Sequence, residues 1–96
     1  MPTFDRTQKF REDYRGLTGE QREAFKTAVR KLVEDLRQGV PRKGLRVKRV
    51  QRRSGVWEMT WADDGRATFE YGVAVRPGHP HVIWRRIGGH DILDNP

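Results

Sequence analysis

"GVWEMTWADDGRATFEYG", residues 55–72, contains two runs in which apolar and polar residues alternate, joined by a short turn. Alternation with a period of two predicts half-buried β-strands, here over residues 56–62 and 66–73. The turn Asp63-Asp64-Gly65 is typical of a tight hairpin, because glycine takes the positive φ that such turns need. The stretch therefore predicts an antiparallel β-hairpin, around which the other elements can be placed.

The two faces of this hairpin differ in polarity, because successive side chains of a strand point to opposite sides. One face is apolar and is expected to form the core; it carries Trp57, Met59, Trp61, Ala67, Phe69, Tyr71 and Val73. The other face is polar; it carries Glu58, Thr60, Arg66, Thr68 and Glu70. We expect this polar face to be uncovered and positive, since a basic segment lies one strand away.

A long amphipathic helix is predicted before the hairpin. Thr18 and Gln21 have the spacing of a capping box, and an apolar stripe runs from Phe25 through Leu32 to Leu36. Gly39 and the proline that soon follows predict its end. We expect Phe25 and Leu32 to pack against the apolar face of the hairpin, with Trp57, Trp61 and Phe69.

A shorter helix is predicted from Asp5 to Tyr14. Asp5 and Gln8 have capping-box spacing, Phe10 and Tyr14 share one face, and Gly16 stops the helix. About two residues separate it from the long helix, which predicts an antiparallel helical hairpin. Further strands are predicted over residues 45–48 and 81–87, and residues 1–4 are a candidate edge strand. The order predicts one α+β domain over residues 1–96, with the helical hairpin on one face of a four- to five-stranded antiparallel sheet.

The charge of the chain indicates a polyanionic or acidic partner. Twenty lysines and arginines against thirteen acids give a net charge of +7 over 96 residues. A segment without acids concentrates this charge and contains Arg42, Lys43, Arg46, Lys48, Arg49, Arg52 and Arg53. A solvated surface strand that keeps the protein in solution is the alternative interpretation of the same segment.

Several classes are disfavoured by what the sequence lacks. It has no cysteine, which excludes disulfides and thiolate metal sites, and its three histidines do not specify a zinc site, so we expect no metal or other cofactor. No apolar run is long enough to span a membrane, and the first residues do not resemble a signal peptide. We expect a cytoplasmic protein.

The last predicted strand ends in a turn that carries a candidate catalytic residue. "VIWRRIGGHDILDNP", residues 82–96, passes through Arg85 and Arg86, breaks at two glycines and presents His90. Imidazole groups exchange protons near neutral pH, which suits acid–base catalysis. A capping group at the end of the strand is the alternative role of His90.

In combination these stretches resemble the RelE/ParE superfamily of toxins from bacterial toxin–antitoxin modules. The resemblance covers nearly the whole chain and rests on the helices, "GLRVKRV", "GVWEMTWADDGRATFEYG" and "VIWRRIGGHDIL". It implies a RelE-like fold and a cognate acidic antitoxin as partner. The RelE-like branch implies a metal-independent endoribonuclease that cleaves mRNA in the ribosomal A site, whereas the ParE-like branch implies a DNA gyrase poison.

The resemblance also implies roles for individual residues. Arg66 would hold the scissile phosphate and His90 would transfer a proton, with Glu58 as an alternative base. Cations that bind RNA or stabilise charge would be Arg46, Lys48, Arg49, Arg85 and Arg86. The chain departs from some ribonuclease members, which carry lysines at the positions of Glu58 and Thr60 and a tyrosine near the end. Which group is acid and which is base stays open, and a binding module without catalysis is a third possibility.

Overall fold

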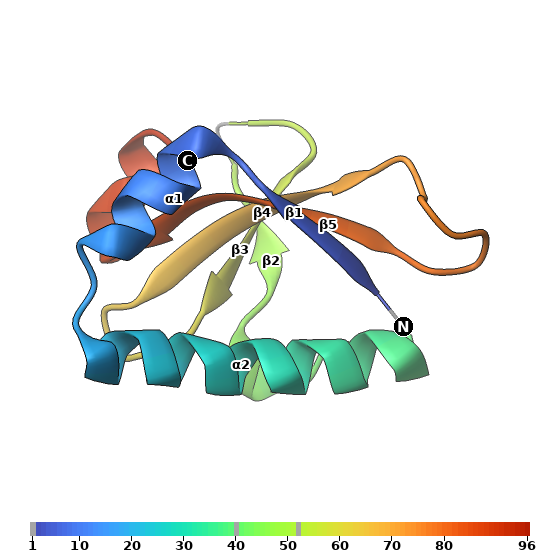
Figure 1. Ribbon diagram of the computed structural model, residues 1–96, viewed down its shortest axis with the longest axis horizontal. Helices are drawn as coiled ribbons and strands as arrows, with labels where there is room; N and C mark the ends of the chain where they lie inside the picture. Colours follow the sequence, from blue (N-terminus) through green and yellow to red (C-terminus); the bar gives the residue numbers. More distant parts are fainter. Residues whose placement is uncertain (1, 40, 52) are drawn as a thin grey trace.

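A computed structural model describes residues 2–39, 41–51 and 53–96. The elements are, in order, β1 (Thr3–Arg6), α1 (Gln8–Arg15), α2 (Gly19–Gln38), the 3₁₀-helix η1 (Lys43–Leu45), β2 (Lys48–Arg49), β3 (Val56–Thr60), β4 (Arg66–Gly72), β5 (His81–Gly88) and the 3₁₀-helix η2 (His90–Asp94). Figure 1 shows α2 running beneath a twisted sheet. Met1 and Arg52, which belong to the predicted edge strand and basic segment, lie outside the described residues.

The predicted α+β class is confirmed, with one change in the sheet. Its five strands are ordered β1-β5-β4-β3-β2. Neighbours from β2 to β5 are antiparallel, but β1 pairs with β5 in parallel, so the expectation of a wholly antiparallel sheet is wrong at this edge. The parallel pair joins segments 78 residues apart, as in Thr3 opposite His81, and such a distant pairing leaves no mark on local periodicity.

The central hairpin has the predicted register. Trp57 lies opposite Phe69 and Glu58 lies opposite Thr68, while Arg66 stays out of the core. A bulge in the pairing of β4 with β5 sets the end of β5, since Thr68 faces Arg86 but Phe69 faces Trp84. Strict alternation would have turned Arg86 toward the core; the extra residue lets Ile87 enter the core in its place.

The long helix is confirmed, whereas the short helix begins later than predicted. At the start of α2 both hydrogen bonds of the Thr18/Gln21 capping box are formed, and Gly39 ends the helix in the left-handed conformation. Asp5 lies in β1 instead of capping α1. The N-cap of α1 is Thr7, whose hydroxyl accepts from the backbone N–H of Phe10.

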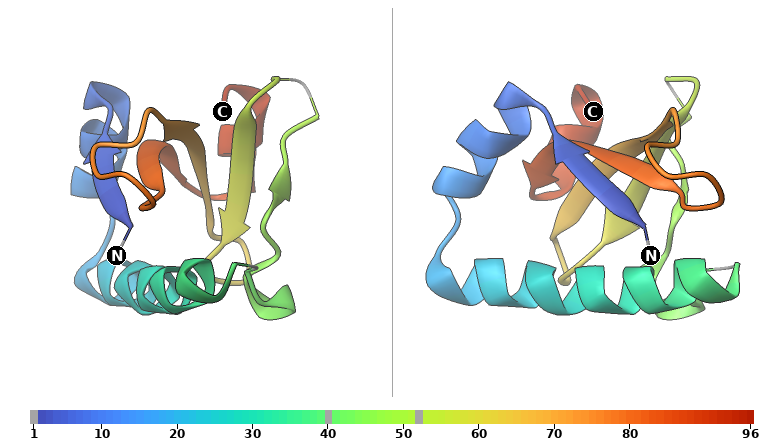
Figure 2. Two further views of the ribbon diagram at one scale, coloured as in Figure 1. Left: turned by 90° about the vertical axis from the view of Figure 1, so that its right-hand side faces the viewer. Right: turned by 45° about the vertical axis from the view of Figure 1, so that its right-hand side comes forward.

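The two helices do not lie side by side as an antiparallel hairpin. They are splayed, with α1 against β5 and α2 along the sheet (Figures 1 and 2). Rings bridge them: Phe10 and Tyr14 of α1 contact Phe25 of α2. The shared aromatic cluster takes the place of direct helix–helix packing.

The core lies between α2 and the apolar face of the sheet. Phe25, Leu32 and Phe69 are buried as predicted, but Trp57 and Trp61 are half-buried and pack at its margin. Tyr71 is 43% exposed, and Val73, beyond the end of β4, is 92% exposed. The strands extend beyond the area that one helix can cover, so alternation alone predicts more buried residues than the structure has.

The polar face of the sheet is partly covered, contrary to expectation. Thr68 is fully buried and Glu58 is 7% exposed, and the apolar side chains of Val50, Val56 and Ile92 are buried as well. Part of the cover comes from η2, which packs against β4 and β5 and whose Leu93 lines a cavity together with Glu58. The predicted strand over residues 45–48 is also wrong in extent: Leu45 is buried in η1, and β2 has two residues. Among the described helices, none combines the length and apolar character that crossing a bilayer requires.

Candidate functional site

A row of polar residues crosses the η2 side of the sheet. Lys48 of β2 pairs with Glu58 of β3, Glu58 with Thr68 of β4, and Thr68 with Arg86 of β5. Cα atoms of such partners are about 5 Å apart, so the row places two cations, a carboxylate and a hydroxyl on neighbouring strands. The sheet thus assembles residues that are up to 38 positions apart in the sequence.

Glu58 is the buried carboxylate of this row. Its carboxylate lies 3.8 Å from Nζ of Lys48, and 9% of its side chain is exposed, against 70% for Lys48. A cavity of about 220 Å³ opens over it, lined by Lys48, Arg49, Val50, Gln51, Glu58 and Leu93. A largely desolvated carboxylate next to one flexible cation is a suitable proton acceptor for a group that enters this cavity.

Arg66 stands one step along the same face. It lies opposite Thr60 and Gly88, two residues beyond the Glu58 row, a shift of about 7 Å along the strands. Its Nη1 donates to the carbonyl oxygens of Ala62, Asp63 and Gly65 at 3.4, 3.2 and 3.0 Å. The guanidinium is held against the hairpin turn by one nitrogen, which leaves its other donors available for an anion.

His90 follows the strand that borders Arg66. It is the first residue of η2 and is exposed. Its backbone N–H is 3.4 Å from Oδ1 of Asp64 in the β3–β4 turn. The β3–β4 turn, which precedes Arg66, and the turn that carries His90 are therefore in direct contact.

Asp64 is a residue of this region that sequence reasoning assigned to the hairpin turn alone. Its carboxylate packs so closely on Gly89 that a Cβ there would lie 2.6 Å from Oδ2. The sequence did contain a hint of a further role for Asp64, because two acids, Asp63 and Asp64, precede the glycine of the turn. A turn requires no second acid at that place, but the sequence does not reveal which distant segment the carboxylate meets.

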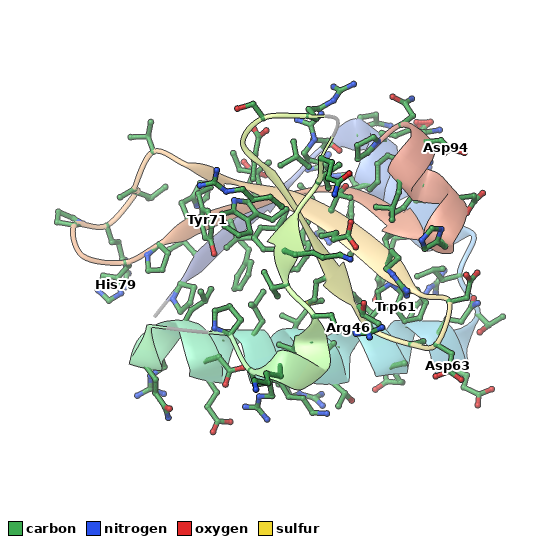
Figure 3. The ribbon with its side chains drawn as sticks, turned by 180° about the vertical axis from the view of Figure 1, so that it is seen from behind. Arg46, Trp61, Asp63, Tyr71, His79 and Asp94 are labelled. Carbon is green, nitrogen blue, oxygen red and sulfur yellow. The ribbon has the colours of Figure 1, made fainter. Side chains whose placement is uncertain are left out.

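The remaining cations divide into exposed and engaged groups. Arg46 is exposed beside Trp61 and Asp63 (Figure 3), and Arg49 lies over the ring of Trp57 at 5.2 Å. Arg85 donates to Glu70 at 2.8 Å and Arg86 donates to Asp13 at 2.6 Å. Both also donate to carbonyl oxygens near the C-terminus, those of Pro96 and Asn95. Their partners favour a structural role for Arg85 and Arg86 over the RNA binding expected of them.

Metal ligands are not gathered anywhere in the described part of the chain. No group of three histidine, cysteine, aspartate or glutamate residues is placed to hold an ion there. The ring of His81 shares a hydrogen bond with the Thr3 hydroxyl at 2.7 Å, and His79 lies at the far end of the molecule from Asp94 (Figure 3). Neither of these histidines belongs to the surroundings of Arg66.

Comparison with known proteins identifies the fold. No family model and no curated protein matches the sequence. Solved structures do match. A chain of the Escherichia coli DinJ–YafQ toxin–antitoxin complex matches with a TM-score of 0.67 at 11% identity, and the match covers 96% of both chains. The RelB–RelE antitoxin–toxin complex of Methanococcus jannaschii matches with a TM-score of 0.61 at 14% identity, covering 95% of both chains. The chain has a RelE-like fold.

A third structure with the RelE-like fold is that of a copper-bound mutant toxin from Helicobacter pylori. It matches with a TM-score of 0.62 at 15% identity, covering 95% of this chain and 97% of the other. The resemblance drawn from the sequence is thus confirmed at the level of the fold. Identities of 11–15% mean that most side chains differ, so the chemistry of this RelE-like chain has to be derived from its own residues.

Proposed function

We propose that this protein is the toxin of a type II toxin–antitoxin module and acts as a metal-independent, ribosome-dependent mRNA endoribonuclease in the cytoplasm. The observation that carries the proposal is the placement of Arg66 on β4, between β3, which bears Glu58, and the end of β5, which leads to His90. The RelE-like fold, shared with chains of toxin–antitoxin complexes, supports the same proposal by analogy.

The reaction would be attack of a ribose 2′-oxygen on the adjacent phosphorus. The new P–O2′ bond forms as the P–O5′ bond breaks, which leaves a 2′,3′-cyclic phosphate and a free 5′-hydroxyl. A base takes the 2′-OH proton and an acid protonates the leaving 5′-oxygen, and an in-line displacement needs them on opposite sides of the phosphate. Glu58 lies on β3 and His90 follows the end of β5, the two strands that border the strand of Arg66, so we assign Glu58 as base and His90 as acid.

The cations would supply charge stabilisation. Arg66 would bind the phosphate with the donors that the hairpin turn leaves available. Lys48, beside the Glu58 cavity, and the exposed Arg46 and Arg49 would hold the RNA backbone on either side. Arg85 and Arg86 would stabilise the end of β5 through their ion pairs rather than touch RNA.

Variants of the three central residues test the mechanism. Loss of a well-placed proton-transfer group costs about 10²–10⁴ in rate. His90→Ala and Glu58→Gln should therefore abolish growth arrest on induced expression, and so should Arg66→Ala. Arg66→Lys should recover part of the activity, because one ammonium cannot reproduce the guanidinium fork. The readout is mapping of mRNA 5′-hydroxyl ends, with His79→Ala, at the far end of the molecule, as the matched control.

The same cells distinguish the rival functions. A gyrase poison, which has no support among the structures compared above, would produce double-strand DNA breaks and no new mRNA ends. A binding module without catalysis would produce neither. If His90→Ala arrests growth as strongly as the parent protein, the imidazole is a capping group and the mechanism is wrong.

A further inference from the structure

Three adjoining cavities run around the outer edge of the sheet, where β2 is the last strand. The first is the cavity of about 220 Å³ over Glu58, which Lys48 lines. The second, of about 430 Å³, is lined by Lys48 together with Arg42 and Arg46. Arg42 and Arg46 also line the third, of about 570 Å³, which lies between α2, η1 and the β3–β4 turn. Because each cavity shares residues with the next, they form one path, the β2 path, from the Glu58 face to the helix side of the molecule.

Positive charge follows the whole β2 path. The acids that line it are Glu58 and Asp63, and the exposed cations that line it are Lys31, Arg42, Lys43, Arg46, Lys48 and Arg49. Three of these cations, Lys31, Lys43 and Arg46, have no ion-pair partner among the described residues. A row of unpaired cations attracts a chain of phosphates, because each contact releases counterions from the nucleic acid. The path therefore suits a polyanion that can follow its bend.

Arg46 lines both the second and the third cavity and has an unusual backbone conformation. Its φ of 49° and ψ of 44° are left-handed, and no other residue except glycine has a positive φ among those described. Glycine would adopt this conformation without strain, so the backbone does not account for an arginine here. Its exposed side chain lies beside Trp61 (Figure 3). The position thus places a cation where the path turns from β2 toward α2, which indicates a ligand with negative charge.

The third cavity adds an aromatic surface to the path. Trp61 lines it and is half-buried, and Ala24, Ala28 and Leu45 contribute further apolar surface. Gly65 of the hairpin turn packs so closely on the indole that a Cβ there would lie 2.7 Å from Cδ2 and Cε2, which holds the ring in place. The volume of about 570 Å³ is within the range of small-molecule sites, about 300–1,000 Å³. A fixed indole next to exposed cations is typical of sites on which a nucleobase stacks.

We propose that the β2 path binds single-stranded RNA, with phosphates on Lys48, Arg46 and Lys31 and one base in the cavity of Trp61. The inference rests on the proposed function, since the strand would be the substrate on one side of the phosphate held by Arg66. An acidic peptide would match the charge, but glutamates offer no flat ring to the indole. The affinity for RNA should therefore grow with strand length until the strand spans the path. Cleavage should also show a base preference at a fixed distance from the cut.

Neighbouring residues of α2 provide a matched test. Lys31 lines the third cavity, whereas Arg30 lines a different groove, on the side of β1 and α1. Lys31→Glu and Arg30→Glu change the net charge equally. The probes are labelled 2′-O-methyl RNA strands of about 4, 8 and 12 nucleotides, the range of single-strand binding sites, which cannot be cleaved because the attacking hydroxyl is blocked. Their binding to the full chain is measured by fluorescence anisotropy, with unlabelled RNA or a glutamate-rich peptide as competitor.

We expect the affinity to rise from the shortest strand to the middle one. Lys31→Glu should weaken binding of the middle strand about tenfold, and Arg30→Glu about twofold at most. Trp61→Leu should also weaken it about tenfold, whereas Trp61→Phe, which keeps a ring, should retain most of the affinity. If Trp61→Leu does not fold, the two charge reversals decide. Equal effects of these reversals, an affinity that does not depend on length, or a peptide that displaces the strand as well as unlabelled RNA does would overturn the proposal.

Mapping of mRNA ends separates this inference from the proposed function. Cells that express the parent protein should show a base preference at a fixed distance from the cut. Trp61→Leu should reduce cleavage and lose that preference among the cuts that remain, whereas Trp61→Phe should keep it. The same preference in Trp61→Leu and the parent would contradict the base site. RNA binding as expected without new mRNA ends would instead contradict the proposed function and leave the β2 path standing.

Discussion

Space, not backbone conformation, accounts for glycine at position 89. Its φ of −84° is open to any residue, but a Cβ would lie 2.6 Å from Oδ2 of Asp64 and 3.2 Å from Oδ1 of Asp91. The absence of a side chain lets the β3–β4 turn lie against the turn that carries His90. The relative placement of Arg66 and His90 thus depends on one missing methyl group.

Gly89→Ala is predicted to separate these two turns. Asp64 must move away from the new methyl, which loosens its contact with the His90 N–H and costs about 1 kcal/mol of stability, the low end for overpacking because the carboxylate is exposed. We expect mRNA cleavage to fall well beyond what the change in melting temperature explains. Gly44→Ala, where a Cβ meets nothing within 4 Å, is the control. Equal activity of the two variants would show that the turn contact does not position His90.

At the scale of elements, a carboxylate fastens the segment after α2 to the helix. Oδ2 of Asp35 accepts from the backbone N–H and Nε of Arg42, and Oδ1 accepts from Nη2, all at 2.8 Å. These bonds fix the chain that leads through η1 to Lys48. The hydrogen bonds from the Arg42 side chain hold the pKa of Asp35 below its ordinary value.

This lowered pKa predicts a stability that depends on pH. A carboxylate with a lower pKa in the folded than in the unfolded state stabilises the fold above the unfolded value, near pH 4, and loses that effect as pH falls through the folded value. Asp35→Asn should lower the melting temperature at pH 7 and flatten its decline below about pH 4. Glu34→Gln, which removes an exposed partner 3.7 Å from Arg42, is the control. If the melting temperatures of Asp35→Asn and of the parent protein fell in parallel as the pH is lowered across this range, the assignment would be contradicted.

At the scale of the whole molecule, α1 is joined to the end of β5 across 73 positions of sequence. Asp13 accepts from Nε of Arg86 at 2.6 Å and from the backbone N–H of Ile87 at 3.2 Å. The pair is mostly buried, with 13% and 18% of the side chains exposed. It holds the bulged end of β5, from which the turn that carries His90 begins.

Asp13→Ala is predicted to cost about 2 kcal/mol, because it leaves a mostly buried guanidinium and a strand N–H without their acceptor. Urea unfolding of Asp13→Ala, Arg86→Met and the double variant should give a coupling energy of about 1 kcal/mol or more. Glu12→Ala, exposed on the same helix, should change stability little. Additive effects of the two substitutions would mean that the pair does not join α1 to β5.

Much of the fold was predictable because its signals lie among neighbouring residues. The capping box of Thr18 and Gln21, the Phe25–Leu36 stripe and the Asp63-Asp64-Gly65 turn each act within a few positions, so the sequence alone determined α2, the β3–β4 hairpin and the α+β class. His90 was found as a candidate from its residue type and its place after the last strand, whereas Arg66 and Glu58 were named as candidates through the resemblance to the RelE/ParE superfamily. Their catalytic roles remain predictions.

The tertiary structure alone decided how distant segments meet. The parallel pairing of β1, the packing of η2 on β4, and the contact of Asp64 with Gly89 join residues more than 20 and up to 78 positions apart. So does the ion pair of Arg86 with Asp13, which engages an arginine that the sequence had suggested for RNA binding. Local periodicity records whether a residue is half-buried, but not which partner buries it. That partner is chosen by the packing of the whole chain, through apolar area and hydrogen bonds that exist once the sheet has formed.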